Sequence, residues 1–292
     1  MMNRVAVFAS KAAAVWLASL LSSVVAAIMV GMGDEGVGSD GPLSGENAFL
    51  LVNGIHAVIL SAIASRSILR GWRLGILIWM TLFFAQSFLL MMEAAYFRDS
   101  LRISTALLVE GSLHVLLTGA LIGAAVSVLW RRPITHIAVA TNSNELPKRL
   151  AMVSVLYVVC YLIAGYFIAW QASEVREYYG FGQDIAMLPL LAFQLLRGAL
   201  WGVLAYILSA NLRGGRNVRA IIVGAAFSVL AVAQLLYPST IMPWEVRLPH
   251  LIEVGISNFL FGACATRILL SGQPSEEEAI QDDPIRGPAP VV

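Results

Sequence analysis

Eight long apolar runs, separated by short polar segments, constrain this 292-residue chain more than any other feature. A helix that crosses a bilayer needs about 20 predominantly apolar residues, because the hydrocarbon core is about 30 Å thick. The chain is 59% hydrophobic and 13% charged, with a mean hydropathy of +0.78, which leaves too little polar surface to cover a water-soluble domain. The sequence therefore predicts an all-α polytopic membrane protein with spans near 12–31, 48–65, 74–97, 103–130, 150–170, 187–210, 219–237 and 248–270.

The polar segments between the runs alternate in charge. Acidic residues dominate every second segment, and basic residues gather in the others: Arg4 and Lys11, then Arg66, Arg70 and Arg73, then Arg131, Arg132, Lys148 and Arg149, then Arg213, Arg216 and Arg219, and finally Arg267. Basic loops stay in the cytoplasm, so we expect a multi-pass protein of the inner (plasma) membrane with both termini cytoplasmic. Membrane lipid is the expected surrounding. No nucleic-acid partner is expected, because the basic residues form no single patch.

The chain contains the same pattern twice, at a shift of 143 residues. The motif LRGxR at 69–73 recurs at 212–216, and LVE at 108–110 corresponds to LIE at 251–253. Each copy would hold four spans, and since four is even, both copies enter the membrane in the same direction. The prediction is two parallel four-helix repeats, 1–130 and 150–270, joined by a cytoplasmic linker over 131–149 and followed by a disordered acidic tail over 271–292.

Several polar or ionisable residues interrupt the apolar runs, and seven of them, all in the outer half at about 1.5 Å per residue, are the candidate site residues. They are Asn53, His56, Glu93, Glu110, His114, Arg197 and Glu253. A charged side chain near the bilayer centre costs about 2.5–3.5 kcal/mol on insertion scales. These residues therefore need partners, water or protonation, and they form the predicted ligand or proton site.

The repeat suggests how these residues pair. Asn53 and Arg197 occupy equivalent positions, as do Glu110 and Glu253. We therefore predict an ion pair between Arg197 and Glu253, and Asn53 close to Glu110. Glu93 lies near the outer end of its run, where a lipid headgroup contact or an ion pair with Arg98 are the alternatives.

Glu110 and His114 are four residues apart and so share one helix face. This spacing leaves three possibilities open. With His56 as a third ligand they could hold a metal, although no HExxH motif is present. His56 and His114 could ligate a b-type haem from two helices. The prediction is neither cofactor, but a hydrogen-bonded polar cluster that is structural or lines a solute or proton path.

The favoured function is binding or passage of a small solute. Arg197 favours an anion, and Glu110 or Glu253 could couple its passage to protons. Since Asn53 and His114 replace Arg197 and Ser257 in the first copy, Glu110 is the glutamate expected to exchange the proton. Two other classes remain as alternatives: a membrane-embedded redox or metal enzyme that uses the histidines and glutamates, and a non-catalytic assembly or sensor subunit.

Overall fold

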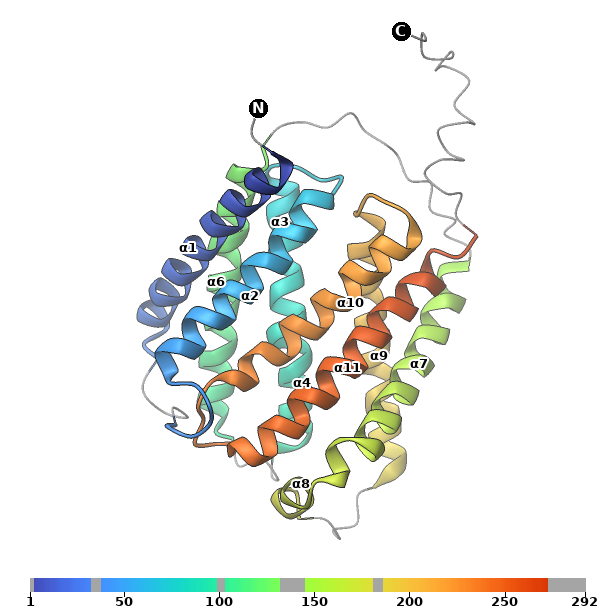
Figure 1. Cartoon of the computed structure of the whole chain (residues 1–292). Coiled ribbons are helices and arrows are strands. Elements are labelled where there is room, and N and C mark those ends of the chain that lie inside the picture. Colours follow the sequence, from blue (N-terminus) through green and yellow to red (C-terminus); the bar gives the residue numbers. More distant parts are fainter. Residues whose placement is uncertain (1–2, 33–37, 99–102, 132–144, 181–185, 273–292) are drawn as a thin grey trace, which may run out of the picture.

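The computed structural model describes residues 3–32, 38–98, 103–131, 145–180 and 186–272. Within these ranges eight helical segments are long and apolar enough to cross a membrane, which confirms the all-helical class and the predicted number of spans (Figure 1). The predicted tail lies almost entirely outside the described residues, and so does most of the predicted linker.

The helices have the following bounds. The first four spans are α1 (Arg4–Val30), α2 (Gly45–Arg66), α3 (Trp72–Phe83) continued by η1 (Phe84–Phe88) and α4 (Leu89–Tyr96), and α6 (Thr105–Leu129). The last four are α7 (Leu146–Phe167) with η3 (Ala169–Gln171), α9 (Met187–Ala210), α10 (Arg216–Val232) with η4 (Ala233–Leu236), and α11 (Trp244–Leu269), while the short α8 (Ser173–Tyr178) follows η3.

Capping side chains decide where several helices begin. The side chain of Asn3 accepts a hydrogen bond from the Val5 amide, so α1 starts eight residues before the apolar run that predicted it. Its first two turns, which contain Arg4 and Ser10, reach Lys11, whose Nζ donates to the carbonyl of Leu129 at the end of α6 (2.8 Å). Ser104 caps α6 in the same way, through the Leu107 amide (3.1 Å).

The third span is not one continuous α-helix. Phe84–Phe88 form a π-helical turn, which inserts one extra residue into the helix and rotates everything beyond it. Ser87 in this turn donates to Ser112 of α6 (3.2 Å). The run 74–97 was predicted as a single helix, because hydropathy contains no signal for the extra residue.

The two sets of four spans pack in the same order. In the first set, α1 packs against α2 and α6, and α3 packs against α6; in the second, α7 packs against α9 and α11, and α10 packs against α11. Contacts between the sets run from α2 to α10 and from α9 to α3 and α4. Glycines allow the closest approach: a Cβ on Gly123 of α6 would lie 2.5 Å from the carbonyl oxygen of Gly75 in α3.

Asp40 holds the segment before α2 against the turn between α10 and α11. Its Oδ1 accepts from the Ser239 amide (3.0 Å) and from Nη2 of Arg247 (2.8 Å), and its Oδ2 accepts from the Trp244 amide (2.7 Å). Arg247 is 2% exposed and also donates to the carbonyl of Met242 (2.9 Å). We call this arrangement the Asp40–Arg247 clasp.

The clasp should weaken in acid. Burial alone would raise the pKa of the Asp40 carboxyl, but hydrogen bonds from Ser239, Arg247 and Trp244 outweigh it and hold that pKa below its ordinary 3.8. A carboxyl with a lowered pKa stabilises the folded state above its ordinary pKa and loses this effect as the pH falls through the folded value. Wild type should therefore exceed Asp40→Asn in melting temperature by a constant amount near neutrality.

That difference should shrink once the pH drops below about 3.8. The measurement is tryptophan-monitored melting across a pH series. Glu46→Gln is the control, because Glu46 is exposed at the start of α2 and should give no comparable difference. A difference for Asp40→Asn that persists unchanged into strong acid would show that the carboxylate charge is not what holds the clasp.

Candidate functional site

Arg197 lies inside the bundle, on the face of α9 that meets α4 and α7. It is 2% exposed, and its Nη2 donates to Oε2 of Glu93 (2.9 Å) while its Nη1 donates to Oε1 of Gln194 (3.0 Å). The guanidinium also lies over the ring of Tyr157, 5.7 Å from its centroid. The predicted ion pair between Arg197 and Glu253 is therefore wrong, because the counter-ion of Arg197 comes from α4.

The position of α4 explains this pairing. Tyr96, one turn beyond Glu93, stacks on Phe193 of α9 with ring centroids 4.4 Å apart. This contact holds the end of α4 against α9, so the Glu93 carboxylate faces the guanidinium. Glu93 was expected to contact a headgroup or Arg98, and it contacts Arg197 instead.

Glu253 has a different partner. Its Oε2 lies 2.8 Å from Nδ1 of His250, one turn earlier on α11. Glu253 is 7% exposed, and a Cβ on Gly165 of α7 would lie 3.7 Å from its Oε1. The His250 ring in turn packs edge-on against Tyr179 (5.7 Å).

The two pairs belong to one polar region. Both border α7: the Arg197 guanidinium lies 5.7 Å from the Tyr157 ring centroid, and a Cβ on Gly165, two turns later, would lie 3.7 Å from Oε1 of Glu253. Tyr161 lies between Tyr157 and Gly165 on the same helix face. We call the region formed by Glu93, Tyr157, Tyr161, Gln194, Arg197, His250 and Glu253 the Arg197 site. It draws side chains from α4, α7, α9 and α11.

Several polar atoms of the Arg197 site are buried without a hydrogen-bond partner among the described residues. They are Nε of Arg197, Nε2 of Gln194 and Nε2 of His250. An unsatisfied buried polar group costs about 1–3 kcal/mol, so such groups call for a ligand or water. Arg197 and Gln194 offer donors. His250 offers an acceptor at Nε2 while its ring is neutral and Nδ1–H bonds the carboxylate, and a donor once the ring is protonated.

Asn53 and His114 lie elsewhere, around α1. Asn53 Oδ1 accepts from the hydroxyls of Ser19 and Ser23, and its Nδ2 donates to the Phe49 carbonyl (2.8 Å). Nε2 of His114 lies 3.1 Å from the carbonyl oxygen of Ser23. Asn53 was predicted beside Glu110, but its amide is bonded to α1 and to its own helix.

The remaining two predicted residues join neither group. Glu110 is partly exposed and makes no hydrogen bond or ion pair to the described residues. His56 is 5% exposed on α2, and its Nε2 has no partner in the described part of the chain. Within that part, no three His, Cys, Asp or Glu side chains gather as a metal site requires.

Sequence reasoning missed four contributors to the Arg197 site: Tyr157, Tyr161, Gln194 and His250. His250 lies near the start of the last apolar run, where an interfacial residue is expected, although its i, i+3 spacing to Glu253 was available as a signal. The two tyrosines and Gln194 carry no comparable signal, since a tyrosine or a single amide is common in an apolar run.

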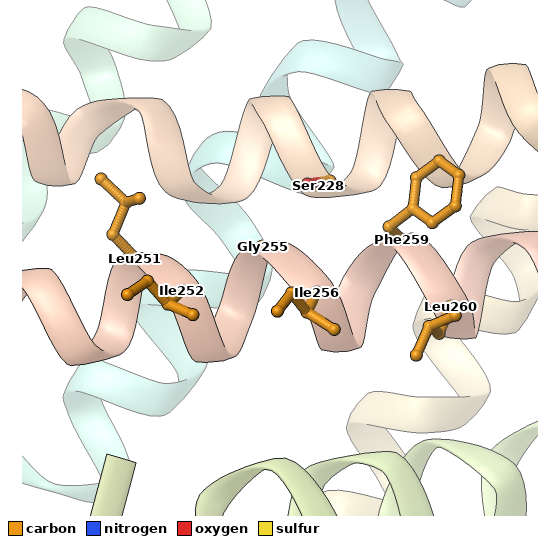
Figure 2. A pocket seen from close by; sticks show the side chains of 7 residues that line it. All are labelled: Ser228, Leu251, Ile252, Gly255, Ile256, Phe259 and Leu260. Atoms are coloured by element: carbon orange, nitrogen blue, oxygen red, sulfur yellow. The ribbon is translucent and has the colours of Figure 1, made fainter. Parts of the chain in front are cut away.

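A groove of about 450 Å³ lies between α10 and α11, and no residue of the Arg197 site lines it. Figure 2 shows its lining, which is Ser228, Leu251, Ile252, Gly255, Ile256, Phe259 and Leu260. Ile252, Ile256 and Leu260 are 43%, 49% and 53% exposed, so the groove faces outward from the bundle. Its apolar lining suits hydrocarbon chains, not a polar solute.

No family model matches the chain, and neither the curated proteins nor the solved structures contain a match. A functional conclusion must therefore come from the geometry.

Proposed function

We propose that this protein binds a small anionic solute at the Arg197 site and passes it across the membrane together with a proton. The unfilled donors on buried Arg197 and Gln194 carry this proposal. A carboxylate or similar oxyanion would accept from both, and it would compete with Glu93 for the guanidinium. Eight apolar helices around this region supply the low-dielectric surroundings in which such bonds are strong.

The proton is assigned to His250 and Glu253. A neutral His250 presents an acceptor at Nε2, which repels an anion, whereas a protonated ring presents a donor. Solute binding and protonation would then favour each other. Glu110 was expected to exchange the proton, but it lies outside the Arg197 site, so the assignment moves to the pair on α11.

We further propose that the bundle consists of two parallel four-helix repeats and lies in the inner membrane with both termini cytoplasmic. The matching packing order of the two sets of spans supports the repeat. The arginines gathered where α1 begins and α11 ends support the orientation. The Arg197 site would then open toward the outer side.

Anion binding can be tested directly on the purified protein in lipid nanodiscs. Small carboxylates, phosphate and halides are screened by thermal shift at mildly acidic and neutral pH, and positive anions are then tested for flux in proteoliposomes. We expect Arg197→Gln to weaken binding about tenfold or more, the cost of one charged hydrogen bond. Arg197→Lys retains the charge opposite Glu93 but has no Nε–H, so it tests the unfilled donor in a folded protein.

Two control variants separate the binding of the solute from the binding of the proton. Glu110→Gln should bind the anion as wild type does, because Glu110 lies outside the site. His250→Gln should bind with an affinity that no longer rises in acid. If no anion in the screen stabilises wild type, or if both Arg197 variants bind normally, the Arg197 site is a structural element of an assembly or sensor subunit.

A further inference from the structure

The turns that follow α2 and α9 both lie at the end of the bundle where α1 begins (Figure 1), and they meet there through backbone hydrogen bonds. The amide of Ile68 donates to the carbonyl of Asn211 (2.9 Å), and the amide of Arg213 donates to the carbonyl of Arg66 (2.7 Å). Ser67 and Leu212 form an isolated antiparallel bridge between the same segments. These hydrogen bonds bring together the two copies of the LRGxR motif.

Two arginines from these motifs are held over the end of α2. Nη1 of Arg70 donates to the carbonyls of Ser67 and Leu69, both at 2.7 Å. Nη2 of Arg213 donates to the carbonyl of Ser65 (3.3 Å). The last carbonyls of a helix carry partial negative charge, which favours cations here. These bonds use only part of each guanidinium, and Nε of Arg213 is buried without a partner among the described residues.

A third arginine borders the same place. Nη1 of Arg66 would lie 3.7 Å from a Cβ built on Gly214, the residue after Arg213. We call Arg66, Arg70 and Arg213 the arginine cluster. Among the described residues, none of the three forms an ion pair with a carboxylate.

Among the described residues the cluster is therefore positively charged with no carboxylate to balance it. Burial, and after it the nearby charge of Arg213, lowers the pKa of Arg70 to about 10. Two positive charges held near each other destabilise the folded state. An anion between them would remove the repulsion and accept the unused donors.

We infer that the arginine cluster binds a phosphate group where the turns after α2 and α9 meet. Guanidinium groups match phosphate geometry through paired N–H donors, and the cluster supplies three of them from the end of α2 and the two turns. The cluster lies directly after α2, at the level where a spanning helix leaves hydrocarbon. A lipid headgroup and a free phosphate compound both supply the same chemistry at that level.

The test uses the full chain in two arms, each read as melting temperature. In the first, inorganic phosphate is added to the protein in a neutral detergent and compared with chloride at equal ionic strength. In the second, nanodiscs of phosphatidylcholine alone are compared with nanodiscs that also contain phosphatidylglycerol, in a buffer without phosphate. A rise in the first arm assigns a free phosphate, and a rise in the second arm alone assigns the headgroup.

Matched variants decide whether the cluster is responsible. Arg70→Gln with Arg213→Gln should abolish the rise. Arg73→Gln with Arg216→Gln removes the same charge from equivalent exposed positions of the two motifs and should leave the rise intact. If the first double variant does not fold, Arg70→Lys with Arg213→Lys keeps the charge without the fork and should weaken phosphate about tenfold. No rise in either arm, or equal loss in the 70/213 and 73/216 variants, would overturn the site.

Discussion

Glu93→Gln is expected to destabilise the protein by about 3 kcal/mol, at the low end of the cost of breaking a buried ion pair. The substitution leaves the Arg197 guanidinium, 2% exposed, without its counter-ion. The side chain of Glu93 is itself 30% exposed, so water can approach and offset part of the loss. The free energy of unfolding is measured in mixed micelles by titration with a denaturing detergent.

Glu110→Gln provides the matched control. It makes the same chemical change in another apolar helix, at a glutamate with no ion pair to the described residues, and should shift stability by less than about 0.5 kcal/mol. Glu93→Gln combined with Arg197→Gln should recover part of the loss, since neither charge is then left alone. Equal losses from Glu93→Gln and Glu110→Gln would contradict the pairing.

Gly123→Leu should prevent the bundle from folding stably. A Cβ at this position would lie 2.5 Å from the backbone oxygen of Gly75, and one on Gly75 would lie 2.7 Å from the backbone oxygen of Gly123. Backbone atoms cannot rotate away as side chains can, so the cost should exceed the roughly 1–3 kcal/mol of ordinary overpacking. The readout is the yield of monodisperse protein and its melting temperature.

The same helix contains the control for this prediction. Gly111 of α6 has nothing within 4 Å of its ideal Cβ position, so Gly111→Leu should fold with nearly the wild-type melting temperature. Leucine is also the better helix former. Should Gly123→Leu melt like Gly111→Leu, then α3 and α6 do not approach through their glycines.

Run length was enough to predict eight spans, because each needs its own apolar stretch. It could not locate the start of α1, where Arg4 and Lys11 are polar but helical and Asn3 supplies the cap. The π-helical turn at Phe84–Phe88 was also beyond prediction. Every residue of that turn is compatible with an ordinary helix, and the extra residue is decided by packing against α6.

The candidate site was predictable by residue type but not by pairing. Polar residues in apolar runs pointed to Arg197, Glu93 and Glu253; Glu93 bonds Arg197, and Arg197 and Glu253 both border α7. The observed ion pairs do not follow the pairing that was predicted from equivalent positions in the two copies. Comparing the two copies of the repeat links Arg197 to Glu253 within one copy, whereas the observed counter-ion comes from α4 in the other set of spans. A contact between the two sets of spans cannot be predicted by comparing the sequences of the two copies.

The two sets of spans are fastened to each other at both ends of the bundle. At one end the Asp40–Arg247 clasp joins them, and at the other the bond from Ile68 to Asn211 does. A body pinned at both ends cannot rock as two rigid halves without breaking one fastening. The helices can still bend between the fixed ends. The π-helical turn, which lies about two turns before Glu93, is the position at which the third span would bend. Any stroke that carries a solute past Arg197 would then be a bowing of single helices, with an amplitude limited by the clasp.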